Sequence, residues 1–172
     1  MPVFSHHTEL KGAIAAFGRR GVNNVVRDAF GQAGDFWAQN FLPRHFFPAA
    51  SGEYGYAKRK GEGARPGSKL FARTAGPAEK AAGEIRPLVY RGDLQRGART
   101  YRVQAVATTK KCSATIFLPR CQGANRRGRN AKHIDMAREL TTISEKEKGL
   151  LVFLLNEEID KGLQQLQDKR TL

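Results

Sequence analysis

The sequence predicts an α+β protein, with a long N-terminal helix and a C-terminal helix packed on a small antiparallel sheet. Two amphipathic stretches, one near each end of the chain, have the spacing of helices that bury one face. Between them, two short runs alternate apolar and polar residues, as strands with one buried face do. A chain of 172 residues can bury a real core. We therefore expect one domain over residues 1–172.

The first helix is expected within an N-terminal helical region, residues 1–47. Apolar residues recur with helical spacing from Thr8, a suitable N-cap, to Pro43, a natural stop. Glycines along this stretch each weaken a helix by up to about 1 kcal/mol relative to alanine. One long helix is the first expectation, and two shorter helices with a break near Gly18–Gly21 are the second.

Residues 48–84 are rich in glycine, alanine and lysine, contain three prolines and have almost no apolar periodicity. This composition is typical of a long loop. A compact domain seldom carries so long a structureless connection unless the connection serves binding. We therefore expect a flexible basic arm here.

Residues 85–119 are expected to form the small sheet. From Tyr101 to Thr108 apolar and polar residues alternate, a polar turn follows, and a second alternating run begins at Ala114. The two runs predict a β-hairpin, which needs a further strand or a helix to bury its apolar face. Residues 85–90 are expected to add one more short strand.

After a second basic loop, residues 120–132, the region 133–172 is expected to be helical. Residues 133–140 predict a short helix, and Ser144 with Glu147 has the spacing of a capping box at the start of a longer one. The apolar face of the longer helix is expected to comprise Leu150, Leu151, Leu154, Leu155, Ile159, Leu163 and Leu166.

The net charge of +14 is concentrated in the middle of the chain. Residues 44–132 contain 20 Lys and Arg against 5 Asp and Glu, whereas residues 1–43 have a net charge of +1 and residues 133–172 of −2. Solubility alone requires no such segregation. The middle of the chain is therefore expected to face a polyanion or an acidic protein surface.

The sequence contains no recognisable catalytic or metal-binding motif. Cys112 and Cys121 are expected to be free thiols, with a disulfide between subunits as the open alternative, since no second Cys or His pair accompanies them. His45 lies beside Arg44 and near two tyrosines, which a nuclease could use, but no carboxylate cluster nearby could hold Mg²⁺. Packing at the helix end is the favoured interpretation of His45. We expect no enzyme activity, no cofactor and no metal.

The N-terminus lacks the basic start, the apolar segment and the cleavage site of a secretory signal. No apolar run approaches the roughly 20 residues that span a bilayer. We therefore expect no membrane contact and residence in a cytoplasm.

Two groups of residues are candidates for contact with partners, because Arg and Tyr are favoured at protein interfaces and Lys and Arg neutralise phosphates without reading sequence. No helix-turn-helix, zinc finger or RNP motif indicates base recognition. The group expected to bind a neighbouring subunit comprises Arg44, His45, Tyr54, Tyr56, Lys58, Arg59 and Lys60. The group expected to contact DNA or an acidic partner comprises Arg120, Arg126, Arg127, Arg129 and Lys132.

The order of several short motifs resembles that of a known family. A long helix ends in WAQNFLPRHF at residues 37–46, Tyr54, Tyr56 and Arg59 follow, then Lys69, and PLVYRGDL at residues 87–94 leads into a hairpin. The stretch from Thr142 to Glu147 precedes the last helix. This combination resembles the neck, or head-to-tail joining, proteins of tailed bacteriophages, including the tail-completion group. Arg91 stands where the related turn often has Thr or Ser.

The resemblance implies a virion structural protein without enzyme activity. Proteins of this kind form a closed ring of six or twelve copies between the portal or its adaptor and the tail tube or terminator protein. Such a ring joins the DNA-filled head to the tail and surrounds the DNA channel, and it is assembled in the host cytoplasm. The alternative from charge alone is a sequence-nonspecific DNA- or RNA-binding protein, for example a ribosome-associated one.

Overall fold

A computed structural model describes residues 3–5, 16–57, 59–89, 91–108, 111–118 and 135–171. The chain forms two compact units, each assembled from segments that are distant in sequence. Each unit has its own apolar cluster. A single domain was expected over 1–172, whereas the contacts divide the chain into two units. The chain leaves the first unit twice and returns to it each time. Unit 1 comprises Met1–Ala38, Arg102–Phe117 and Glu145–Leu172, and unit 2 comprises Gln39–Tyr101 and Leu118–Ser144.

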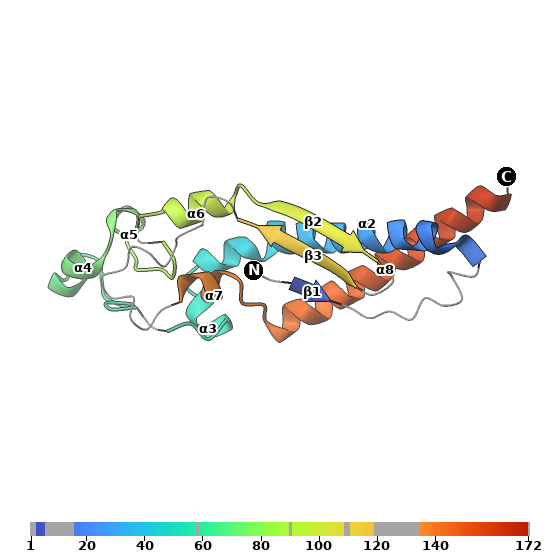
Figure 1. Ribbon diagram of the computed structural model, residues 1–172. Coiled ribbons are helices and arrows are strands. Elements are labelled where there is room, and N and C mark those ends of the chain that lie inside the picture. The colour runs from blue at the N-terminus through green and yellow to red at the C-terminus, as the bar shows by residue number, and fades with distance from the viewer. Residues whose placement is uncertain are drawn as a thin grey trace. The chain divides into compact units, whose positions relative to one another are not determined.

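Two long helices within the described part of the chain, together with a small antiparallel sheet, confirm the α+β prediction (Figure 1). Helix α2 spans Arg19–Asn40 and ends before Pro43, and helix α8 spans Glu145–Thr171. Gly18 adopts a φ of +75°, which interrupts the helical conformation between residue 17 and Arg19. The expected break near Gly18–Gly21 is therefore confirmed, and the expected N-cap Thr8 lies outside the described residues.

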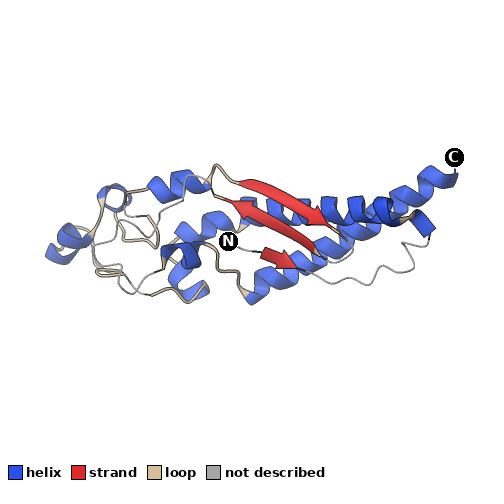
Figure 2. Ribbon diagram, viewed as in Figure 1, coloured by secondary structure: helices blue, strands red, loops and turns tan. Residues whose placement is uncertain are grey.

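Three strands form one antiparallel sheet in the order β1-β3-β2 (Figure 2). Strands β2 (Arg102–Ala107) and β3 (Cys112–Phe117) are the expected hairpin, with Ala105 opposite Ala114. The third strand is β1 (Val3–Ser5), which pairs with β3. The prediction of a strand at residues 85–90 is wrong. Leu88 has a left-handed φ of +61°, which an extended strand does not accommodate.

The core of unit 1 lies where α2 packs against one face of the sheet and α8 packs beside α2. The buried residues are apolar at helical spacing, and α2 approaches both neighbours through small residues. A Cβ atom at Gly34 would lie 2.8 Å from Val103 Cγ1 of β2, and one at Gly162 of α8 would lie 2.5 Å from Val25 Cγ1 of α2. The cluster comprises Val22, Val26, Ala29, Phe30, Ala114, Leu155 and Ile159.

Unit 2 consists of short helices where a structureless arm was expected. Residues 48–84 form three of them, so the expectation of a loop without secondary structure is wrong. Local capping explains why such short helices form: Ser68 Oγ accepts a hydrogen bond from Phe71 N at 3.1 Å, and Glu79 Oε2 accepts one from Gly76 N at 2.7 Å. The helices among the described residues of this unit are η1 (Leu42–Phe46), α3 (Ala50–Glu53), α4 (Lys69–Thr74), α5 (Pro77–Ala82), α6 (Asp93–Ala98) and α7 (Met136–Leu140).

The region 85–119, expected to form the small sheet, contains helix α6 ahead of the hairpin. Gly92, with a φ of +76°, is the N-cap of α6. The PLVYRGDL motif therefore enters a helical turn before the chain reaches β2. The basic loop expected at residues 120–132 lies outside the described residues.

No helix among the described residues is both long and apolar enough to cross a membrane.

Candidate functional site

The buried centre of unit 2 is an aromatic cluster around His45. Pro43 lies in the first turn of η1, which follows α2 directly, and the His45 side chain two residues later is fully buried. Its ring stacks on Tyr54 with centroids 4.1 Å apart and planes 16° from parallel. Tyr54 in turn stacks on Tyr56 at 5.5 Å. These three side chains therefore form one packed stack inside the unit.

The carbonyl oxygen of Glu139, on α7, accepts hydrogen bonds from this stack. His45 Nδ1 lies 3.1 Å from it and, since a carbonyl only accepts, Nδ1 carries the hydrogen. The Tyr56 hydroxyl donates to the same carbonyl and also contacts His45 Nδ1. Burial lowers the pKa of His45 to about 4, although the Glu139 hydrogen bond opposes that shift. His45 is therefore a neutral structural group at pH 7.

The Glu139 carboxylate makes a separate contact with Arg59. Both guanidinium Nη atoms approach the two carboxylate oxygens, one in a close ion pair and the other at 3.3 Å. The two side chains are 14% and 11% exposed, so the pair is largely removed from water. Glu139 thus joins α7 to residues 45–59 through both its main chain and its side chain.

These placements correct part of the expected subunit-binding group. His45, Tyr54 and Tyr56 are 0%, 9% and 7% exposed, so they hold unit 2 together and do not present a surface to a neighbour. Arg59 is mostly committed to Glu139. The helix-end interpretation of His45 is confirmed. Its burial offers no route for a phosphodiester to reach the ring.

Other members of the two candidate groups have different outcomes. Arg44 is exposed, with its guanidinium 4.9 Å from the centre of the Phe41 ring, and Lys60 is exposed. Both stay predictions as partner contacts. Lys58 lies outside the described residues, and so does the whole second group, Arg120, Arg126, Arg127, Arg129 and Lys132.

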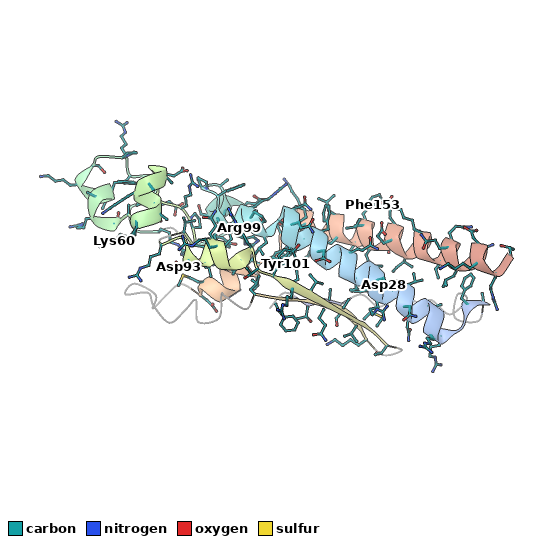
Figure 3. The ribbon with its side chains drawn as sticks, turned by 90° about the horizontal axis from the view of Figure 1, so that it is seen from above. Asp28, Lys60, Asp93, Arg99, Tyr101 and Phe153 are labelled. Atoms are coloured by element: carbon teal, nitrogen blue, oxygen red, sulfur yellow. The ribbon has the colours of Figure 1, made fainter. Side chains whose placement is uncertain are left out.

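The segregation of charge follows the division into units. Unit 2 contains 18 Lys and Arg against 7 Asp and Glu, a net charge of +11, and unit 1 carries the remaining +3. Lys60 and Arg99, labelled in Figure 3, are two of the exposed cations of unit 2. Unit 2 is therefore the part of the protein suited to an acidic partner. Its other exposed cations among the described residues are Arg44, Arg65, Lys69, Arg73, Lys80, Arg91, Arg96 and Arg138.

Helix α8 carries a second surface, which is apolar. Leu150 and Phe153 are 52% and 62% exposed, and Figure 3 shows Phe153 on the outer side of α8. Leu150 was expected in the buried face and is not, because Leu151, Leu155 and Ile159 occupy that face at spacings of four. Phe153 lies outside the apolar face expected for this helix, and helical spacing alone gives an exposed Phe no role.

No group of three or more His, Cys, Asp or Glu side chains that could hold a metal ion gathers within the part of the chain that the structure describes. Cys112 is a half-buried free thiol, and burial raises its pKa. Cys121 lies outside the described residues.

Comparison of the chain with protein-family models, with curated proteins and with solved structures found no match.

Proposed function

We propose that this chain is a virion structural protein of the tailed-phage neck, forming a ring of six or twelve copies between head and tail. The observation that carries the proposal is the segregation of charge between units: unit 2 has a net charge of +11 and unit 1 of +3. A ring subunit around DNA needs one part suited to a polyanion and another suited to protein neighbours.

Three further features support the same proposal. The motif order from residue 37 to residue 147 resembles that of neck proteins. The exposed apolar side chains of α8 supply material for a protein interface. The buried His45 network gives a structural role to the histidine and tyrosines that had suggested catalysis.

The partners in this proposal are the portal or its adaptor on one side and the tail tube or terminator protein on the other. Contact with genomic DNA is electrostatic and sequence-blind. Heterologous contacts between identical subunits close into a ring when the rotation between neighbours divides a full turn.

Electron microscopy of the purified protein and of virions tests the proposal. Rings of the isolated protein, and its presence at the neck in labelled particles, are the expected results. Phage lacking the protein should accumulate filled heads and separate tails. A protein that stays monomeric at every concentration and is absent from particles would contradict the proposal.

A sequence-nonspecific DNA- or RNA-binding protein is the second candidate, favoured by the same charge of unit 2. It predicts nanomolar to micromolar binding of unrelated duplexes that weakens steeply between about 50 and 200 mM salt. A neck protein binds DNA in the same salt-dependent way but also forms rings without it. Ring formation in the absence of nucleic acid therefore separates the two candidates.

A further inference from the structure

The outward face of α8 combines apolar and acidic side chains, and we call it the α8 stripe. Leu150, Phe153, Glu157 and Asp160 follow one another at spacings of three and four, so they share one side of the helix. All four are exposed, and they lie opposite the buried Leu151, Leu155 and Ile159. The stripe therefore offers an apolar contact with two carboxylates next to it.

Two lysines lie close to the α8 stripe. Lys146 is one turn before Leu150, at the end of the stripe away from the carboxylates. Lys161 follows Asp160, and its ammonium forms an ion pair with Glu158 at 2.8 Å. The acidic character of the stripe is thus confined to the turn holding Glu157 and Asp160.

Helix α4 in unit 2 has the opposite combination, which we call the α4 patch. Lys69, Leu70 and Arg73 are exposed, with Leu70 at 43%. The neighbouring Phe71 is turned into the apolar cluster with Ala75 and Ile85, which fixes the direction in which the patch faces. An apolar side chain with two cations beside it is the chemical complement of the α8 stripe.

We propose that the α8 stripe of one copy binds the α4 patch of a second copy of this chain. This inference rests on the proposed ring and names the contact that builds it. Leu70 packs against Leu150 and Phe153, and Lys69 and Arg73 face Glu157 and Asp160. The two surfaces differ, so the contact is heterologous, and each subunit offers one of each to its two neighbours.

Charge distinguishes this pairing from the symmetrical ones. Two α4 patches would bring cations together, and two parallel α8 stripes would bring together the turns that hold Glu157 and Asp160. Two antiparallel stripes would set Lys146 opposite Asp160, which is one cation for each acidic turn, whereas the α4 patch supplies two. Like charges juxtaposed at an interface oppose binding, whereas complementary ones fix the partner and the register. The proposed occupant of the α8 stripe is therefore the α4 patch.

Sedimentation velocity over a range of protein concentrations tests the contact. The variant Glu157→Lys/Asp160→Lys should self-associate at least about tenfold more weakly than the unmodified protein, and so should Lys69→Glu/Arg73→Glu. Asp28→Lys/Asp35→Lys, which alters the net charge as the first variant does but at exposed positions of α2, should associate normally. Circular dichroism should show all three folded.

Mixing the two impaired variants gives the sharpest result. Each variant keeps one natural surface and one reversed surface, so an equimolar mixture should assemble by alternation while each variant alone does not. Phe153→Ser and Leu70→Ser should each weaken assembly without rescue on mixing with either charge variant.

The outcomes separate the contact from the ring. If Lys69→Glu/Arg73→Glu assembles like the unmodified protein, or if the mixture fails to assemble, the contact is wrong while the ring stands. If the unmodified protein never assembles, the proposed ring fails and the contact fails with it.

Discussion

The indole Nε1 of Trp37 donates a hydrogen bond to Glu147 Oε2 at 3.2 Å, joining α2 and α8 across 110 positions of sequence. Both residues are buried, at 0% and 1% exposure. A carboxylate so far from water needs donors, and Trp37 supplies one while filling the space between the helices. The hydrogen bond between Trp37 and Glu147 is therefore part of the packing between α2 and α8 in unit 1.

Replacing Trp37 by Phe should lower the free energy of unfolding by about 1–3 kcal/mol, because a buried carboxylate loses a donor. Glu147→Gln should cost less, since the amide oxygen still accepts the hydrogen bond. Urea denaturation followed by circular dichroism measures both. Lys148→Ala, at an exposed position of the same helix, should hardly change the free energy of unfolding. An equally large decrease for Lys148→Ala would contradict the claim that the buried pair stabilises unit 1.

Gly34→Ala should destabilise unit 1 even though alanine is the better helix former. The added Cβ would lie 2.8 Å from Val103 Cγ1, and overpacking costs about 1–3 kcal/mol, more than the roughly 1 kcal/mol gained in helix propensity. Gly149→Ala is the matched control, because nothing lies within 4 Å of its Cβ position, and it should stabilise α8. Adding Val103→Ala to Gly34→Ala should recover part of the loss. Equal thermal midpoints for the two glycine variants would refute the packing argument.

The stability of unit 2 should fall as the pH is lowered from about 6.5 to about 4. Burial lowers the pKa of His45 in the folded protein to about 4, whereas an unfolded histidine titrates near 6.5. The unfolded state therefore binds more protons in this window, and stability is lost as the pH falls through it, by about 3 kcal/mol in total. Denaturant midpoints measured across the window should drop more steeply for the unmodified protein than for His45→Gln. Parallel pH profiles would show that His45 does not cause the loss.

Breaking the ion pair between Arg59 and Glu139 should cost about 2–3 kcal/mol, because the remaining charge is left largely buried. Glu139→Gln removes the carboxylate charge but keeps the carbonyl that His45 and Tyr56 use, so it isolates the pair. A double-mutant cycle with Arg59→Met measures the coupling by urea denaturation. Arg96→Met, in the exposed pair with Asp93, is the control and should change stability by less than about 1 kcal/mol. A coupling free energy between Arg59 and Glu139 no larger than that expected for the exposed pair would contradict the claim that burial makes this ion pair stabilising.

The parts of the fold that were predictable from sequence are those specified by local pattern. The hairpin followed from strict alternation, and α2 and α8 followed from apolar spacing and from Pro43. Strand β1 has only three residues, too few for a pattern, and its strand character depends on pairing with β3. Helices α3 to α6 have four to six residues each, less than two turns, so periodicity carries no signal for them.

The site residues divide in the same way. His45 at the helix end was predictable from Pro43. Tyr56, together with Tyr54 stacked on it, was interpreted as part of an arm because Glu139, the hydrogen-bond partner of Tyr56, is 83 positions away. Glu79 is a second example, with partners closer in sequence. Its buried carboxylate accepts hydrogen bonds from Gly76 N at 2.7 Å and from Arg86 N at 3.2 Å. A single acidic residue in the sequence does not predict this role. Which polar residues stabilise the fold depends on tertiary contacts, and the spacing of residues in the sequence does not predict those contacts.

The route of the chain between the units constrains how the protein can fold during synthesis. Unit 1 needs α2, the hairpin and α8, and α8 is synthesised after both of the others. Trp37 can bond to Glu147 only after a further 110 residues have been synthesised, and Val25 likewise packs against Gly162 only once α8 has formed. Until then the apolar face of α2 is exposed to solvent and to other proteins. The nascent chain, rather than the folded subunit, is therefore the form that most needs a chaperone.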